Sequence, residues 1–140
     1  MENQNLTQAL TKAANMMWRV APIIVGTIIL VSLASVLIPK SFYAAIFQNN
    51  ILDPVVGSSI GSILAGNPIT SYIIGGELLK QGVSLVAVTA FIVAWVTVGI
   101  VQLPAESMIL GKRFAITRNI ISFILSIIVA ILTFLILAAI

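Results

Sequence analysis

Four long apolar stretches occupy most of this chain, at about residues 20–38, 51–79, 83–103 and 120–140. Three of them approach the ~20 residues that an α-helix needs to cross a bilayer. Hydrophobic residues make up 60% of the 140 positions and charged residues only 8%, a composition outside the range of soluble globular domains. The sequence predicts an all-α integral membrane protein with one transmembrane domain, residues 20–140, and three spanning helices at about 20–38, 83–103 and 120–140.

The residue inventory excludes several kinds of chemistry. The chain has no cysteine and no histidine, so disulfides, thiolate metal sites and imidazole acid–base catalysis are excluded. No phosphate-binding glycine loop or nucleophile–base pair is present, and we expect neither an enzyme nor a cofactor or metal site. The net charge of +3 comes from Lys and Arg beside apolar stretches, which indicates contact with lipid headgroups rather than nucleic acid.

Residues 1–19 are predicted to form a separate amphipathic helix in the membrane interface. Apolar side chains recur there at helical spacing, and the segment ends in Trp18-Arg19, an aromatic and a cation suited to headgroup depth. The alternative is a simple helical extension of the first span.

The second apolar stretch contains two helix-start signals. Asp53-Pro54 and Asn67-Pro68 each offer an N-cap side chain followed by proline at the first helical position. Gly66 favours a helix end between them. We predict two half-helices, 54–65 and 68–80, each roughly 18 Å long and therefore about half of a ~30 Å hydrocarbon core.

These half-helices either cross the membrane as one broken helix or turn back as a re-entrant hairpin. A crossing distributes the Lys and Arg residues three against four between the two sides, whereas a hairpin distributes them five against two. The hairpin gives an ordinary positive-inside bias, with a multi-pass chain in the plasma membrane and a cytoplasmic N-terminus. We therefore favour the hairpin.

The break between the half-helices is the predicted substrate site. Lipid cannot satisfy free backbone groups, so a break at membrane depth must be buried in protein or line a wet cavity. The positive end of the second half-helix favours an anionic or polar ligand, and the carbonyls that end the first favour a cation. A Pro-kinked packing helix is the alternative. The candidate substrate-binding residues are Gly66, Asn67, Pro68, Thr70 and Ser71.

Small and charged residues elsewhere have predicted roles as well. Gly57, Gly61 and Ala65 form a small-residue face suited to helix packing or to contact between subunits. Asp53 is explained as a helix cap, and Glu77 as a surface ion pair with Lys80. Glu106 follows an apolar span, so it is a candidate for proton coupling or for an ion pair with Arg113 or Arg118.

Several motifs resemble one half of the predicted permease family, which includes organoarsenical efflux permeases. The resemblance covers roughly residues 20–118 and rests on Ala65-Gly66-Asn67-Pro68, Gly82-Val83-Ser84 with Ala90-Phe91, Leu103-Pro104-Ala105-Glu106 and Leu110-Gly111-Lys112-Arg113. Members carry two related halves, which implies that a half-size chain assembles at least as a homodimer with the pore between protomers. Members with a Cys motif at the break engage arsenic through thiolate. This chain has no cysteine, so the resemblance implies a permease of unspecified substrate.

The leading hypothesis is a secondary transporter in the lipid bilayer that moves a small polar or ionic solute as a homodimer or higher homo-oligomer. A non-transporting membrane scaffold, acting as a partner subunit of a larger complex, is the alternative from a different class. A small multidrug exporter with an antiparallel dimer ranks last, because the acid usual in its first span is missing.

Overall fold

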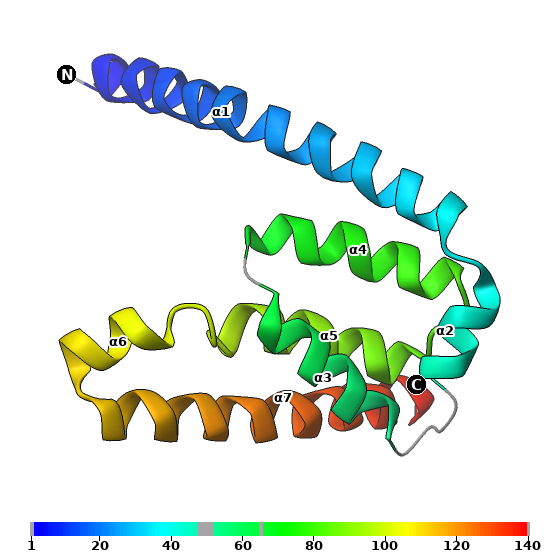
Figure 1. Ribbon diagram of the computed structural model, residues 1–140. Coiled ribbons are helices and arrows are strands. Elements are labelled where there is room, and N and C mark those ends of the chain that lie inside the picture. Colours follow the sequence, from blue (N-terminus) through cyan, green and yellow to red (C-terminus); the bar gives the residue numbers. More distant parts are fainter. Residues whose placement is uncertain (1, 48–51, 65, 140) are drawn as a thin grey trace.

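The described part of the chain folds into helices alone (Figure 1). The structure is a computed structural model that describes residues 2–47, 52–64 and 66–139. Within these ranges no strand occurs, and the all-α prediction is confirmed there. The helices are α1 (Glu2–Leu37), α2 (Lys40–Ile46), α3 (Asp53–Ile63), α4 (Pro68–Lys80), α5 (Leu85–Thr97), α6 (Leu103–Leu110) and α7 (Lys112–Ala139).

Helices α1 and α7 each contain a segment that is long and apolar enough to cross a membrane. These segments are Leu6–Leu37 in α1 and Lys112–Ala139 in α7. The 28 residues of α7 extend roughly 42 Å at 1.5 Å per residue, which exceeds a ~30 Å hydrocarbon core. These two helices contain the first and last predicted spans. Ile38 lies just beyond α1, and Ile140 lies outside the described residues.

Helix α1 runs without interruption through the boundary expected near residue 19. The structure has one helix of 36 residues where the sequence predicted an interfacial helix followed by a span. The physical reason is local: no Gly or Pro occurs before Pro22, so no residue ends the helix. The continuous helix agrees with the alternative of a helical extension, and the interfacial position of residues 1–19 stays a prediction.

The predicted span 83–103 is interrupted, which corrects that assignment. Its helix, α5, has 13 residues and extends roughly 20 Å, too short to cross a ~30 Å core alone. The backbone becomes extended at Val98, with φ −100° and ψ 112°, and helix resumes at Leu103 as α6. Pro104 lacks an N–H and its ring would clash with the carbonyl of Ile100, so it disfavours a continuous helix here.

Helix α5 lies at the centre of the structure, with α3, α4 and α7 packed against it. Glycines let α3 approach closely: a Cβ at Gly57 would lie 2.2 Å from the Ala87 carbonyl oxygen, and one at Gly61 would lie 2.3 Å from that of Phe91. The small-residue face therefore packs within one chain, which leaves no room for a second subunit at these glycines. The third predicted member, Ala65, lies outside the described residues.

Helices α3 and α4 form a hairpin whose two outer ends lie at the same end of the molecule (Figure 1). They occupy Asp53–Ile63 and Pro68–Lys80, close to the predicted half-helices. A side-chain contact agrees with this arrangement: Ser84, which follows the end of α4, donates to the carboxylate of Asp53 at the start of α3 at 3.2 Å. The hairpin turn lies next to the far end of α5.

Candidate functional site

Two helix breaks meet at one cavity. The first separates α3 from α4, and the second separates α5 from α6. A cavity of about 180 Å³ lies between them, lined by residues from segments 62–68 and 95–102. No charged side chain lines this cavity among the described residues. It can therefore bind a ligand through backbone groups, amides and apolar surface.

The first break is fixed by local capping. The side chain of Asn67 accepts a hydrogen bond from the Ile69 N–H at 3.0 Å, and the Asn67 carbonyl accepts the Thr70 N–H at 2.9 Å. Pro68 occupies the first turn of α4 and contributes no N–H. At the other side, Leu64 is extended and its N–H reaches the Ile60 carbonyl at 3.3 Å. The sequence signals in this segment are sufficient to form the break.

The second break is held by a residue from α7. Asn119, only 6% exposed, accepts the Gly99 N–H through Oδ1 at 2.8 Å. Its Nδ2 donates to the Ala115 carbonyl at 2.9 Å. This buried amide replaces the helical partner that the Gly99 N–H would otherwise have, so α7 stabilises the extended backbone at the end of α5.

Trp95 joins the two breaks. Its Nε1 donates to the Gly66 carbonyl at 3.4 Å, a long hydrogen bond, and its ring packs edge-to-face on Phe91 with centroids 5.5 Å apart. A Cβ at Gly66 would lie 3.1 Å from the Trp95 ring. A larger residue at position 66 would therefore press on this ring.

An ion pair lies behind the second break. Arg118 of α7 pairs with Glu106 of α6 and also donates to the Thr97 carbonyl at 3.3 Å. A guanidinium at this position stabilises the C-terminal end of α5. The second oxygen of Glu106, Oε2, is buried and has no hydrogen-bond partner among the described residues.

The structure therefore brings Glu106 and Arg118 together, as one predicted alternative required. Arg113 is exposed, and no acid of the described segments pairs with it. The predicted pair of Glu77 and Lys80 is confirmed at 3.3 Å. Hydrogen bonds from Gln81 and, next, from Ser35 of α1 lower the pKa of Glu77, with a smaller contribution from Lys80.

Asp53 has a different position from the predicted cap, because the N-cap residue of α3 is Leu52. The carboxylate of Asp53 is buried and accepts a hydrogen bond from the Ser84 hydroxyl at 3.2 Å. Ser84 in turn caps α5 by accepting the Ala87 N–H at 3.3 Å. Asp53 thus connects the starts of α3 and α5.

The predicted substrate residues lie in different surroundings. Gly66 and Pro68 line the cavity, whereas Asn67, Thr70 and Ser71 do not. The Asn67 side chain caps α4, and the Ser71 hydroxyl is buried and donates to the Pro68 carbonyl at 2.7 Å.

Sequence reasoning missed the second wall of the cavity, which includes Trp95, Gly99 and Gln102, and the supporting Asn119. A signal was present, because Gly99 and Pro104 repeat the order of glycine stop and proline start seen at the first break. The uninterrupted apolar composition of 83–103 concealed it.

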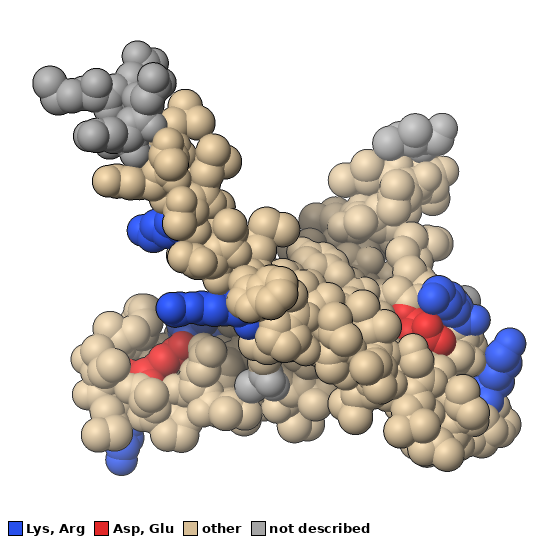
Figure 2. Space-filling model, turned by 90° about the horizontal axis from the view of Figure 1, so that it is seen from above, with Lys and Arg blue, Asp and Glu red and all other residues tan. Residues whose placement is uncertain are grey.

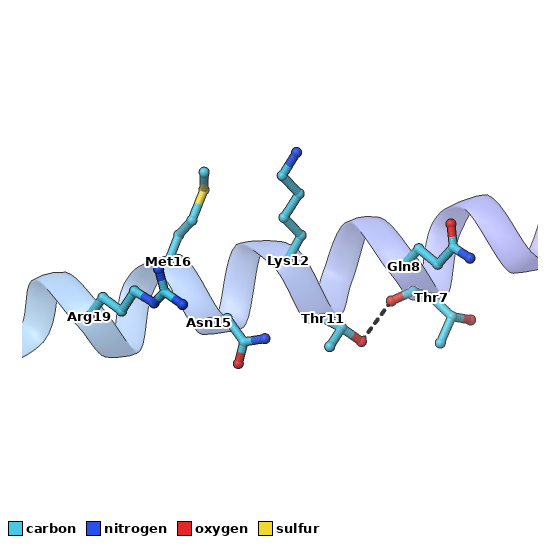
Figure 3. A pocket seen from close by; sticks show the side chains of 7 residues that line it. All are labelled: Thr7, Gln8, Thr11, Lys12, Asn15, Met16 and Arg19. Atoms are coloured by element: carbon cyan, nitrogen blue, oxygen red, sulfur yellow. Dashed lines mark hydrogen bonds between the residues drawn. The ribbon is translucent and has the colours of Figure 1, made fainter.

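A second, larger hollow follows the polar side of α1 (Figure 3). Its volume is about 520 Å³, and all of its lining residues belong to one helix: Thr7, Gln8, Thr11, Lys12, Asn15, Met16 and Arg19. A single helix does not enclose a ligand, so this surface is a weaker candidate than the cavity between the breaks.

Charged side chains gather toward the two ends of the face shown in Figure 2, with an uncharged region between them. Such a distribution is typical of a protein whose middle is surrounded by lipid.

No protein-family model, curated protein or solved structure matches the chain.

Proposed function

We propose that this chain is a membrane permease, a secondary transporter that moves a small solute through the cavity between its two helix breaks. The observation that carries the proposal is the meeting of two breaks at one cavity in a chain this apolar. Broken helices at membrane depth are tolerated where they line a cavity, and secondary transporters bind substrates at discontinuous helices.

The proposed topology has α1 and α7 spanning the bilayer, α3 and α4 re-entering from one side, and α5 with α6 crossing as a broken helix. The hairpin arrangement of α3 and α4 supports it (Figure 1). Lys12 and Arg19 then share a side with the three cations at the start of α7, five against the two of Lys40 and Lys80. The positive-inside rule places the N-terminus in the cytoplasm of a multi-pass plasma-membrane protein.

A homo-oligomer is part of the proposal, because α1 has little contact with the remaining helices. No residue of its apolar segment, Leu6–Leu37, is buried, and this helix touches mainly α4. Lipid or a second protomer covers this surface in the bilayer. The resemblance to two-half permeases supports the second protomer.

Labelling of single introduced cysteines tests the topology. The wild-type chain gives no background labelling because it contains no cysteine. Single cysteines at Lys40, Lys80 and Lys112 are treated with an impermeant maleimide in sealed vesicles. We expect Lys40→Cys and Lys80→Cys to label from one side and Lys112→Cys from the other. Labelling of positions 80 and 112 from the same side contradicts the re-entrant arrangement.

Flux into proteoliposomes tests the transport function. A panel of small charged and polar solutes is screened with the wild-type chain, and any flux is compared with that of Gly66→Leu. We expect loss of flux, because the added side chain meets Trp95 at the cavity. Gly76→Leu is the matched control, since nothing lies within 4 Å of a Cβ there.

The scaffold alternative makes a different prediction for the same preparation. It is supported by the exposed apolar surface of α1, which a partner subunit can cover. A partner that copurifies in fixed stoichiometry, together with no flux from the chain alone, favours the scaffold over the permease.

A further inference from the structure

We infer that the cavity between the helix breaks accepts a small organic cation, a substituted ammonium ion, in preference to an anion. This inference rests on the proposed function and names the substrate class of the same site. Four features carry it: the occupied N–H donors, the free carbonyls, the aromatic wall and the size of the cavity.

The N-terminal helix ends at the cavity offer few hydrogen-bond donors to an anion. In α4, Pro68 has no N–H, and the N–H groups of Ile69 and Thr70 are occupied by Asn67. In α6, Pro104 again has no N–H, and that of Leu103 reaches the Ile100 carbonyl at 3.3 Å. The positive end of α4, which was expected to favour an anionic or polar ligand, therefore offers few of the free N–H donors that an anion site normally uses.

The loop between α5 and α6 adds little to this supply. Its Gly99 N–H is occupied by Asn119. The N–H groups of Ile100 and Val101 have no partner among the described residues, but these two residues are 48% and 62% exposed. The loop therefore leaves these two N–H groups free at the cavity wall, fewer than the carbonyls available at the helix ends there.

The C-terminal helix ends supply acceptors instead. The last carbonyls of a helix lack intrahelical partners and carry the negative end of its dipole. Both α3 and α5 end at this cavity, and Ser62 and Val96 belong to its wall. The carbonyl oxygens of Ser62 and Val96 accept no hydrogen bond from the N–H of any described residue outside the helices. Arg118 occupies only the Thr97 carbonyl.

Trp95 provides the aromatic wall. Tryptophan is the side chain that binds cations best through its π-face, and this one is only 9% exposed. Phe91 and the Gly66 carbonyl fix the orientation of its ring. None of the described residues that line the cavity is a carboxylate, so carbonyl and aromatic groups must balance the charge, an arrangement that suits a cation with apolar substituents.

The size of the cavity limits the ligand. A volume of about 180 Å³ corresponds to roughly six water-sized groups, since water occupies about 30 Å³ in the liquid. Apolar side chains such as Leu64 and Val98 form part of the wall and suit methyl groups. Tetramethylammonium is therefore an appropriate probe.

Equilibrium dialysis of radiolabelled tetramethylammonium against the purified full chain in detergent tests the inference. We expect saturable binding that weakens about tenfold or more in Trp95→Leu and less in Trp95→Phe, which keeps a ring against Phe91. Trp18→Leu is the matched control, because Trp18 is 83% exposed and lies on α1. Far-UV circular dichroism and elution volume establish that each variant folds.

Absence of saturable tetramethylammonium binding, or binding that neither Trp95 variant weakens, overturns the inference. Radiolabelled acetate that binds with the same dependence on Trp95 overturns it as well. A different result would contradict the proposed function alone. Cation binding without flux of any solute contradicts the permease but still supports the cation site. Anion flux that Gly66→Leu abolishes supports the permease and contradicts the cation site.

Discussion

One methyl group added at Gly57 tests the packing of α3 on α5. In Gly57→Ala the new Cβ would lie 2.2 Å from the Ala87 carbonyl oxygen, whereas carbon contacts are favourable at about 3.5–4.0 Å. The neighbour is backbone and cannot rotate away, so α3 must move by roughly 1 Å or more. Overpacking of this kind costs about 1–3 kcal/mol, and the better helix propensity of Ala returns about 0.5–1 kcal/mol. We expect net destabilisation of up to about 2.5 kcal/mol.

Unfolding in mixed micelles, driven by increasing SDS and followed by far-UV circular dichroism, measures this difference. Gly76→Ala is the control: nothing lies within 4 Å of a Cβ at that helical position, and we expect stabilisation of about 0.5–1 kcal/mol. Gly61→Ala should behave like Gly57→Ala because its Cβ would lie 2.3 Å from the Phe91 carbonyl oxygen. Equal stability of Gly57→Ala and Gly76→Ala refutes the close packing of α3 on α5.

Three further perturbations follow from side-chain contacts. Asn119→Leu leaves the Gly99 N–H unpaired, so we expect a loss of about 1–3 kcal/mol in the same unfolding assay; an unchanged midpoint contradicts the role of Asn119. A double-mutant cycle of Glu106→Gln and Arg118→Gln should give a coupling of about 1 kcal/mol, since the pair is only partly buried; zero coupling excludes a structural ion pair. Because the pKa of Glu77 is lowered in the folded state, its stabilisation is present above the unfolded pKa and is lost as the pH falls through the folded pKa. The stability difference between the wild type and Glu77→Gln should therefore shrink in acid, and a constant difference refutes it.

The first helix break was predictable because its causes are adjacent in sequence. Asn67 caps α4 through atoms two and three residues away, and Pro68 adds a backbone constraint at the same point. The predicted half-helices, 54–65 and 68–80, agree closely with Asp53–Ile63 and Pro68–Lys80. Capping is a local interaction, so a single sequence contains the information needed.

The second break was missed because its stabilising partners are distant in sequence. Gly99 depends on Asn119, 20 residues away, and the end of α5 depends on Arg118, 21 residues from Thr97. A run of apolar residues predicts a continuous helix when those partners are unknown. The interaction between Trp95 and Gly66, 29 residues apart, was hidden for the same reason.

The sequence alone determined the helical class, the α3–α4 break, and the Glu77 ion pair. These follow from composition and from contacts between residues a few positions apart. Only the tertiary structure decided which surfaces pack within the chain and where the two helix breaks meet at a cavity. Gly57 and Gly61 pack on α5 rather than on a second subunit, and the cavity exists because α7 holds the α5–α6 break opposite the first. Such contacts depend on how helices pack in space, which helical spacing within one segment does not specify.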